Sequence, residues 1–549
     1  MPTFTSDRIT TFWACALLVG VSLLAYAPIW NAYFLGDDFA YVGLYANRPF
    51  SEWVEIVAKD WTKGIWGYKF DELRSMMALA FWWDGKLWPS QPFGYHLTNL
   101  LFHASSSIMV FLIARRYLGG AFSTSLFAGL LFSVLPAHAE AVAWISGRAD
   151  PICTLFSLVS LWAFMAYRAD GQFGLYAASL ATFCLALLSK EIAITFPLLP
   201  LGYDLFGRRN YGEAWWKLIR AQAGFWILTG TYLLIRHSVF PHAVREDLLN
   251  RQLVFSFALR QARYLSFLMF GVPPVLALLL LLIVAALVLF VWRHNNQFPQ
   301  FAFLRAVLFL GPWWYLACVA PLIVTYTSAR HLYLTSVGFC LLAATFMRCA
   351  IPRRGFATAS FCVLSVSAIL LVRQNLRWSF AGYASNQART GIVQFARTLS
   401  PGAGLILNIP ESLGKQHLWL ASLPFALQPP FVQSDSYSPF RVMEKPSTYR
   451  FWSGASDGSG RTWRADKLVV LEGLIAKPSD CYLVSLNAGG EVVTLRVPAS
   501  NVGRSLSPFL QVLANRGPNA RVLDLDDDWN QFVRQLSKQA ELWQPLAAR

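Results

Sequence analysis

TFWACALLVGVSLLAYAPIW, residues 11–30, opens a series of apolar runs that continues to about Val372. Most runs approach the roughly 20 residues that an α-helix needs to cross a bilayer. The chain has 549 residues, of which 56% are hydrophobic, more than a protein that faces only water usually contains. We therefore predict a polytopic α-helical membrane protein with about 11 transmembrane helices.

The basic residues follow a topological pattern. The formal net charge is +16, but Lys and Arg are spread over short loops between the apolar runs, which argues against nucleic-acid binding and for contact with anionic lipid headgroups. They fall in alternate loops: Arg115, Arg116, Arg168, Arg208, Arg209, Lys217, Arg220, Arg293, Arg348, Arg353 and Arg354. By the positive-inside rule these loops are cytoplasmic, which places the N-terminus inside and the intervening loops and the tail outside.

An acidic pair follows the first apolar run, in the stretch Leu35-Gly36-Asp37-Asp38-Phe39 on the predicted outer side. The two acids would simply mark an outer loop in the plainer interpretation. Ionisable residues at a membrane boundary are costly, however, and adjacent carboxylates raise one another's pKa. A carboxylate in this setting suits proton abstraction from a hydroxyl group, so we predict that Asp37 and Asp38 are catalytic.

Further charged clusters fall on the same predicted side. They comprise His138 and Glu140, Arg148 and Asp150, Lys190 and Glu191, and Arg330 and His331. A cation outside the membrane runs against the topological bias, and Arg is well suited to phosphate, so the pattern indicates an anion site. The competing interpretations are an ion pair of Arg148 with Asp150 in a connecting loop and a snorkelling Lys190.

A polar stripe marks the predicted outer start of the second membrane segment. His96, Asn99 and His103 share one helix face because they are spaced i, i+3, i+7. They suit either metal binding or hydrogen bonds between helices, and the second use is more common in a helical bundle. The need for a divalent metal stays open at this point.

The composition divides the chain into a membrane part, residues 1–375, and a tail, residues 376–549, with a first outer loop at 31–95 that carries interfacial helices. The tail opens with a predicted helix, Asn375–Thr398, and continues with strand-like runs. These are residues 405–407, 468–471, and 482–484 joined through Gly489 and Gly490 to 492–495, a hairpin signal. We predict a soluble α/β or β-rich domain.

Several motifs resemble one family. Gly94-Tyr95-His96-Leu97-Thr98-Asn99-Leu100-Leu101-Phe102-His103 and residues 135–150, LPAHAEAVAWISGRAD, are similar to stretches of the O-mannosyltransferases that carry transmembrane and tetratricopeptide regions. Ser189-Lys190-Glu191 and residues 329–334, ARHLYL, fit the same family in order and spacing. The chain departs from it at Leu135, where the family has histidine, and the tail shows no tetratricopeptide repeats.

The resemblance implies a membrane glycosyltransferase of the C-type (GT-C) fold that uses a polyprenyl-phosphate sugar and inverts the sugar carbon. Asp37 and Asp38 would provide the base. The residues expected to hold the lipid phosphate are Arg148, Lys190, Arg330 and His331. Those expected to support them or the acceptor are His96, Asn99, His103, His138, Glu140, Asp150 and Glu191.

The implied partners are the lipid-linked donor, membrane lipids, and a protein, lipid or glycan acceptor. No cofactor is certain. The implied location is a bacterial inner membrane with the active site and the tail in the periplasm. A lipid-linked glycan ligase or polymerase is the main alternative function. A transporter or flippase is a weaker one, because transporters place ionisable groups near the bilayer midplane and show repeated halves.

Overall fold

The computed structural model describes residues 4–46, 48–63, 65, 72–119, 121–207, 215–241, 251–280, 282–283, 286 and 300–398, and parts of the tail: 404–408, 412–413, 416–418, 422–432, 441–443, 481–486 and 492–497. Contacts divide the chain into two compact units. The first consists of Met1–Trp30, Arg48–Asp84 and Phe93–Leu376. The second consists of Asn31–Asn47, Gly85–Pro92 and Arg377–Arg549.

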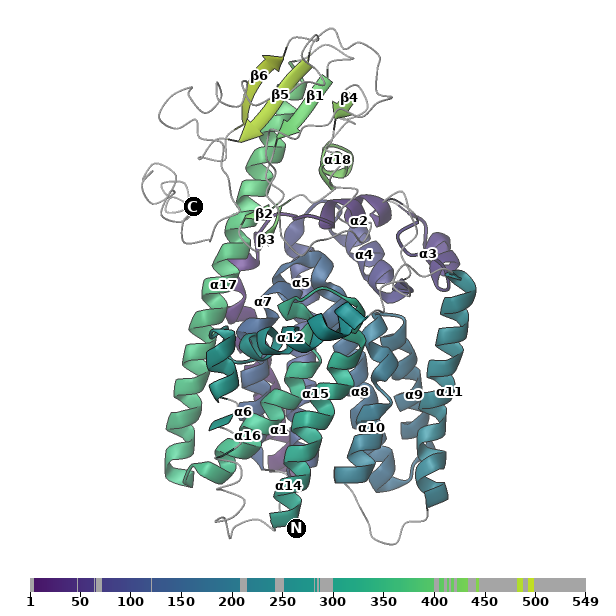
Figure 1. The fold of residues 1–549 in the computed structure, drawn as a ribbon, viewed down its shortest axis with the longest axis vertical. Coiled ribbons are helices and arrows are strands. Elements are labelled where there is room, and N and C mark those ends of the chain that lie inside the picture. Colours follow the sequence, from purple (N-terminus) through teal and green to yellow (C-terminus); the bar gives the residue numbers. More distant parts are fainter. Residues whose placement is uncertain are drawn as a thin grey trace. The chain divides into compact units, whose positions relative to one another are not determined.

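The first unit is built from apolar helices (Figure 1). Among the described residues, five helices are long and apolar enough to cross a membrane, or six if one bent pair counts as a span. The five are Pro92–Tyr117, Ile145–Asp170, Trp215–Val239, Phe303–Ile323 and Arg353–Phe395. The protein is an integral membrane protein, as predicted, and the larger number of spans inferred from the sequence stays a prediction.

The elements of the helical part, in chain order, are α1 (Phe4–Ala25), η1 (Ala27–Ile29), α3 (Phe50–Ile56), α4 (Ser75–Leu87), α5 (Pro92–Tyr117), α6 (Phe122–Ser133), η2 (Pro136–His138), α7 (Ala139–Ala143), η3 (Ile145–Arg148), α8 (Ala149–Asp170), α9 (Phe173–Leu187), η4 (Glu191–Thr195), α10 (Leu198–Gly202), η5 (Tyr203–Gly207), α11 (Trp215–Val239), α12 (Arg251–Leu268), α14 (Gln300–Leu308), η7 (Phe309–Trp313), α15 (Trp314–Val319), η8 (Ala320–Val324), η9 (Ala329–Leu332), α16 (Thr335–Ala350) and α17 (Arg353–Ala396).

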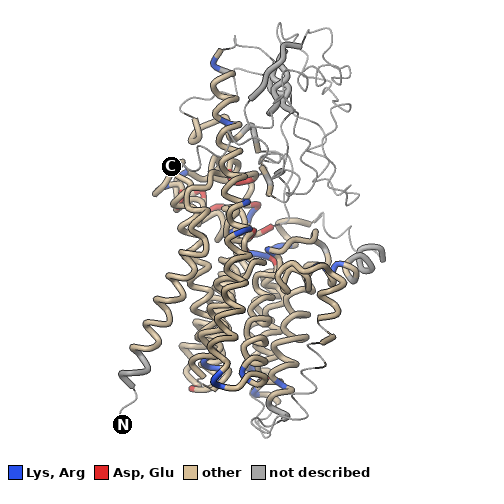
Figure 2. The backbone as a smooth tube through the Cα atoms, turned by 90° about the vertical axis from the view of Figure 1, so that its left-hand side faces the viewer, with Lys and Arg blue, Asp and Glu red and all other residues tan. Residues whose placement is uncertain are grey.

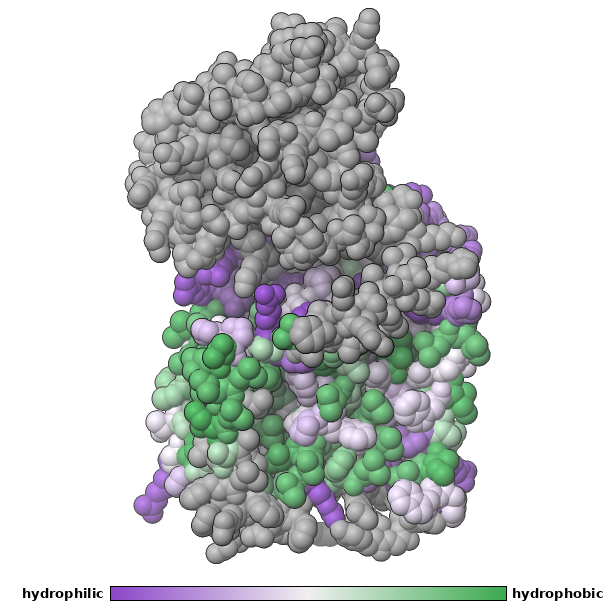
Figure 3. Space-filling view, in the orientation of Figure 1, coloured by the Kyte–Doolittle hydropathy of each residue, from purple (hydrophilic) through white to green (hydrophobic). Residues whose placement is uncertain are grey.

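Side chains in these helices sort by environment. Large apolar residues such as Leu234 and Phe361 are 74% and 72% exposed, which a membrane accommodates and water does not. Figure 3 shows hydrophobic side chains over most of the described face of the helices and hydrophilic ones toward both ends. Figure 2 shows Lys and Arg at the lower helix ends and Asp and Glu mixed with Lys and Arg toward the upper ends. The charges therefore lie in two levels of different sign composition.

Glycine permits close helix contacts at two points. A Cβ on Gly129 of α6 would lie 3.0 Å from the Phe111 Cβ and 3.1 Å from the Ser107 carbonyl oxygen of α5. A Cβ on Gly338 of α16 would lie 2.7 Å from the Leu310 carbonyl oxygen of η7. Small residues at such crossings let helix backbones approach within a membrane, where dispersion contacts stabilise packing.

The chain bends between the end of α6 and the start of η2 and α7. The two pieces, Phe122–Ser133 and Pro136–Ala143, meet at 42°. Pro136 lacks a backbone N–H and stands at the first position of η2, so the α6 helix cannot continue through it. This break places His138 at the buried end of η2 and Glu140 at the start of the short helix α7.

One long helix replaces two predicted ones. The sequence suggests a membrane segment ending near Val372 and a separate helix at 375–398, but α17 runs without a break from Arg353 to Ala396, 44 residues. At about 1.5 Å per residue it extends roughly 66 Å. The drop in hydropathy marks a change of environment along this helix and not its end.

The second unit combines the acidic stretch with parts of the tail. Its helices are α2 (Asp38–Tyr45) and α18 (Leu423–Ala426). Phe34 and Phe39 both pack on Phe431, with ring centroids 5.2 and 5.0 Å apart. Gly36 has φ of 52°, which favours glycine, and its N–H donates to the Leu418 carbonyl at 2.8 Å.

The strands form a small mixed sheet in the order β4-β1-β5-β6 (Arg441–Met443, Gly404–Asn408, Cys481–Leu486, Val492–Val497). β1 pairs in parallel with β4 and β5, and β5 pairs antiparallel with β6, with Cys481 opposite Val497. The predicted pairing of these two runs is therefore confirmed, and the predicted turn at Gly489 and Gly490 lies outside the described residues. A second ladder joins β2 (Ser412–Leu413) to β3 (Gln416–His417). The strand predicted at 468–471 lies outside the described residues, and the α/β character of the whole domain stays a prediction.

Candidate active site

Lys190 and Asp150 form a nearly buried ion pair where the start of α8 lies near the end of α9. The Lys190 Nζ lies 2.5 Å from Asp150 Oδ1, and the two side chains are 8% and 3% exposed. Burial lowers the pKa of Lys190 from its ordinary value of 10.5; Asp150 opposes this shift, and Arg330 and Arg74 add to it. The Lys190 ammonium is thus a charge held by its neighbours and not a solvated one.

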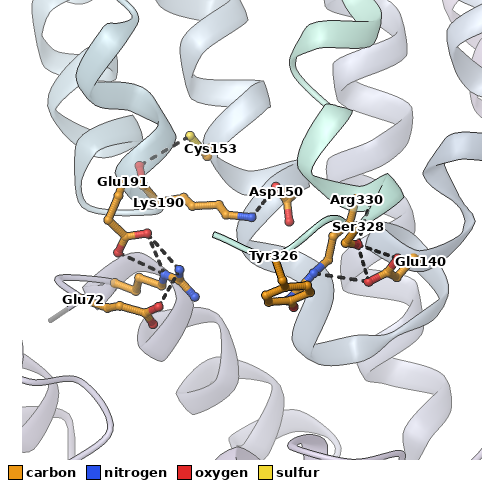
Figure 4. Close-up of polar contacts among 10 residues, drawn as sticks. Glu72, Glu140, Asp150, Cys153, Lys190, Glu191, Tyr326, Ser328 and Arg330 are labelled. Atoms are coloured by element: carbon orange, nitrogen blue, oxygen red, sulfur yellow. Dashed lines mark hydrogen bonds and ion pairs between the residues drawn. The ribbon is translucent and has the colours of Figure 1, made fainter. Parts of the chain in front are cut away.

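Glu191, the next residue, points to a different partner. Arg74, just before α4, donates from Nη2 to Glu191 Oε2 at 2.8 Å and from Nε to Glu191 Oε1 at 3.2 Å. Its Nη2 also lies 2.9 Å from Glu72 Oε1. Side by side in the sequence, Lys190 and Glu191 therefore connect α8 to the first loop (Figure 4).

A third group surrounds Arg330. Ser328 caps η9 by accepting from the Arg330 N–H, and its hydroxyl donates to Glu140 at 2.7 Å. The Arg330 Nε lies 3.4 Å from Glu140 Oε1, and its guanidinium carbon lies 4.8 Å from the centre of the Trp144 ring. Its Nη2 also donates to the Tyr326 hydroxyl. The guanidinium is held by a carboxylate, a phenol and an aromatic face.

His331 contributes an uncharged ring. It is 4% exposed, and burial keeps its pKa well below 6.5, with Lys190 and Arg330 opposing a further positive charge. The sequence suggests a cation at this position. Burial and the neighbouring cations Lys190 and Arg330 disfavour the charged form of this imidazole.

These residues make up one set, which we call the charge cluster: Arg74, Lys190 and Arg330 with Glu72, Glu140, Asp150 and Glu191. Figure 4 shows the Lys190 and Arg330 side chains entering the same region, with Tyr326 between Asp150 and Glu140. The cluster has one more carboxylate than cations. A phosphate would therefore compete with carboxylates for donors that are already placed and desolvated.

Arg148, predicted as a phosphate ligand, has a different set of partners from the charge cluster. The Arg148 side chain is 0% exposed and pairs with Asp84 Oδ2 at 2.7 Å. It also donates to the Ile145 and Tyr95 carbonyls at 3.1 and 3.2 Å, and its guanidinium carbon lies 4.3 Å from the centre of the Phe81 ring. A guanidinium enclosed in this way joins α4, α5 and η3. The competing interpretation, an ion pair of Arg148 with Asp150, is not what the structure shows: Arg148 pairs with Asp84, and Asp150 pairs with Lys190.

Asn99 fixes the loop that carries Arg148 and Asp150. Its amide nitrogen lies 3.2, 3.3 and 3.4 Å from the carbonyls of Val142, Trp144 and Ile145. Gly147 permits the same turn, since a Cβ there would lie 2.9 Å from the Glu140 carbonyl oxygen. Asn99 is thus a positioning residue.

The imidazoles of His103 and His138 are used inside the bundle. His103 contacts the Tyr333 hydroxyl at 2.5 Å and the Ser133 carbonyl at 3.0 Å. His138 contacts the Phe132 carbonyl at 2.9 Å and the Ser336 hydroxyl at 2.7 Å. Both rings, and His96, are buried. Of the two uses open from the sequence, hydrogen bonding between helices is the one that the structure supports for His103 and His138, and no metal-ligand set of three His, Cys, Asp or Glu occurs in the described part of the chain.

Asp37 and Asp38 belong to the second unit and differ in their environment. Asp38 is 1% exposed, and its Oδ2 accepts from the Leu35 N–H at 2.9 Å. Asp37 is 8% exposed and stands at the N-cap of α2. A carboxylate at this end of a helix is stabilised by the helix dipole. Asp38 thus holds the turn, and Asp37 is the more accessible acid.

Three charged residues described here were not found from the sequence: Glu72, Arg74 and Asp84. Asp84 lies in the apolar run around Phe81 and Trp83, where an acid requires a partner, so a signal was present. Arg74 lies in an ordinary polar stretch after Glu72 and carries no such signal. Only the fold brings it to Glu191.

Comparison with known proteins shows similarity to mannosyltransferases. The family model described as dolichyl-phosphate-mannose-protein mannosyltransferase matches residues 79–233. This range includes Asp84, Arg148, Asp150 and Lys190. The resemblance predicted from the sequence is therefore confirmed over this part of the chain.

Individual relatives lead to the same group. Protein O-mannosyl-transferase Tmtc1 of Drosophila melanogaster is 32% identical over 195 residues, which cover 33% of this chain and 22% of that protein. Protein O-mannosyl-transferase TMTC4 of Homo sapiens is 27% identical over 246 residues, covering 39% and 32%. The matches thus span less than a third of the length of these relatives.

Among solved structures, the chain is similar to ArnT from Cupriavidus metallidurans bound to undecaprenyl phosphate, with a TM-score of 0.48, 13% identity, and coverage of 91% of this chain and 95% of that one. It is also similar to an oligosaccharyltransferase of Archaeoglobus fulgidus, with a TM-score of 0.41, 12% identity, and coverage of 71% and 55%.

Proposed function

We propose that this protein is a GT-C glycosyltransferase that moves a sugar from a polyprenyl-phosphate donor to an acceptor hydroxyl. The observation that carries the proposal is the charge cluster. Its Lys190 and Asp150 lie within the segment that matches the mannosyltransferase family model. Relatives of that segment are named protein O-mannosyl-transferases. Lys190 and Arg330 hold the donor phosphate in this proposal, and His331 adds a neutral hydrogen bond.

The chemistry follows from charge. In the donor, the phosphate joins lipid and sugar and bears one negative charge. When the bond between the anomeric carbon and the phosphate oxygen breaks, the electron pair leaves with the phosphate, which becomes a doubly charged monoester. Fixed cations bind the developing charge more strongly than the donor, and this difference accelerates the step.

The acceptor oxygen forms the new bond on the opposite face of an oxocarbenium-like sugar, so the configuration inverts. The acceptor hydroxyl proton passes to a carboxylate, which we assign to Asp37 because it is more exposed than Asp38. Asp150 and Glu140 orient Lys190 and Arg330. Arg148 takes no part in contacting the donor.

The proposal includes a location. The cluster and the tail face the outside of a bacterial inner membrane, with the N-terminus in the cytoplasm, about 11 spans and a soluble α/β domain after α17. This rests on the placement of Lys and Arg in the sequence. Reporter fusions after Arg354 and at the C-terminus test it, with the first expected inside and the second outside.

The activity test uses purified protein in nanodiscs with labelled polyprenyl-phosphate monosaccharides and a panel of peptide, lipid and glycan acceptors. We expect label to move from the lipid to an acceptor, and the product to have the inverted anomeric configuration. Transfer from lipid-linked oligosaccharide alone would indicate a ligase. Movement of intact lipid-linked sugar across a vesicle without transfer would indicate a flippase.

A further inference from the structure

The contact between Arg74 and Glu191 joins two segments far apart in the sequence. Arg74 donates hydrogen bonds to both carboxylate oxygens of Glu191, from Nε to Oε1 at 3.2 Å and from Nη2 to Oε2 at 2.8 Å. The two side chains are 15% and 13% exposed, so the pair is largely removed from water. A bidentate pair of this kind fixes orientation as well as distance.

A backbone bond supports the same connection. The Met76 N–H, at the start of α4, donates to the Leu188 carbonyl at 3.1 Å. Leu188 is the C-cap of α9 and precedes the turn Ser189-Lys190-Glu191, where Lys190 has extended backbone. The first loop therefore contacts this turn on both sides of Lys190.

The consequence for Lys190 is geometric. Lys190 and Glu191 point to opposite partners, Asp150 and Arg74, so the turn is held by one ion pair on each side. If Arg74 releases Glu191, the turn is tied through Asp150 and the Leu188 carbonyl. The backbone of Lys190 is then held less firmly on its Glu191 side, and the advantage of a preorganised cation decreases.

We propose that Arg74 is a positioning residue for the donor phosphate site, acting through Glu191 to hold Lys190 in place. This inference rests on the proposed function. Arg74 pairs with both Glu72 and Glu191, so its main contribution to the site is placement. The first loop, through this residue, sets how well the site binds its lipid phosphate.

The charge of Arg74 provides a second readout. The charged and titratable groups around Lys190 come from four segments: Asp150 and Cys153 of α8, Glu191 beside it, Arg330 and His331 of η9, and Glu72 and Arg74 of the first loop. Arg74 lowers the pKa of Lys190. Its removal should therefore raise the pKa of Lys190 and move the alkaline limb of the pH profile to higher pH.

The test compares Arg74→Gln, Glu191→Gln and the double variant, in nanodiscs, by the affinity for polyprenyl phosphate and by KM and kcat for the labelled donor. We expect each single variant to weaken the affinity for polyprenyl phosphate and to lower kcat/KM about tenfold. The double variant should be no worse than either single variant, because both remove one contact. In Arg74→Gln the alkaline limb should also move upward. Arg48→Gln, which removes an exposed partner of Glu52 from the same loop, is the matched control and should behave as wild type.

Two results would overturn the inference. If Arg74→Gln weakens binding and Glu191→Gln does not, Arg74 contacts the phosphate directly. If neither changes the affinity or kcat/KM while both proteins retain wild-type thermal stability, the tie has no role in binding. Lys190→Gln separates this failure from that of the proposed function: if polyprenyl phosphate binding is also unaffected by Lys190→Gln, the phosphate site itself is misassigned.

Discussion

Arg148 and Lys190 lie in one half of the molecule and carry the same charge, yet their surroundings differ. Arg148 is fully enclosed, with Asp84, two carbonyls and an aromatic ring around it. Lys190 has one carboxylate partner and lies near Arg330 and Arg74, two further cations. We infer that a charge in a membrane bundle stabilises the fold when its donors are filled, and that it is suited to binding an anion when several like charges lie close together.

The variant Arg148→Met tests whether Arg148 stabilises the fold, and it has the largest expected effect. It leaves Asp84 buried without its cation, and we expect a loss of about 3–5 kcal/mol of stability. Burial already raises the pKa of Asp84, so the carboxyl should take up a proton in this variant. Thermal unfolding in detergent measures the effect. The double variant Arg148→Met with Asp84→Asn should recover part of the lost stability. If Arg148→Met is as stable as wild type and fails only in donor binding, Arg148 is a phosphate ligand after all.

Asp37 and Asp38 differ in a similar way, because Asp38 is the more buried and accepts a hydrogen bond from the Leu35 N–H. Asp37→Asn should reduce kcat by about 10²–10⁴-fold, the range for removal of a general base. Asp38→Asn keeps an oxygen that accepts from the Leu35 N–H, so we expect a loss below about tenfold. Transfer rates at saturating donor measure both. A larger loss in Asp38→Asn than in Asp37→Asn would exchange their roles.

Lys190→Gln and Arg330→Gln sharpen the other side of the comparison. We expect each to lower kcat/KM about 100-fold, or roughly 2.7 kcal/mol, while the folded state is retained. Lys190→Arg should retain part of the activity. As a control, the unfolding temperatures of these variants should equal that of wild type within error. A loss of stability as large as that of Arg148→Met would show that Lys190 and Arg330 stabilise the fold.

The smallest expected effect is a pH shift in Asp150→Asn. Asp150 raises the pKa of Lys190, so its removal should lower that pKa and move the alkaline limb of donor binding to lower pH. The direction is opposite to that expected for Arg74→Gln. A limb that stays in place, or that moves upward, would show that Lys190 does not set it.

The sequence predicts the helical class well because hydrophobic length leaves few alternatives for a chain in a bilayer. It also predicts the hairpin of β5 and β6, through the turn at Gly489 and Gly490 between alternating runs. It overlooks the continuity of α17, since a fall in hydropathy at Arg373 indicates a change of solvent and not of backbone.

For the site, the sequence identifies the charges but not their partners. Glu140, Asp150, Lys190 and Arg330 were predicted together, and they do meet in the charge cluster. Arg148, two residues from Asp150, turns to Asp84 instead, because the turn at Gly147 directs neighbouring side chains to different elements. Arg74 could not be predicted, since its role depends on a contact across 117 positions of sequence.

The central claim is that Lys190 and Arg330 hold the donor's phosphate. The most direct measurement is the affinity of nanodisc-embedded protein for polyprenyl phosphate, comparing wild type, the double variant Lys190→Gln with Arg330→Gln, and Arg48→Gln. We expect the double variant to lose at least about 100-fold in affinity for polyprenyl phosphate, equal to roughly 2.7 kcal/mol, and Arg48→Gln to lose none. Wild-type affinity in a folded double variant would contradict it.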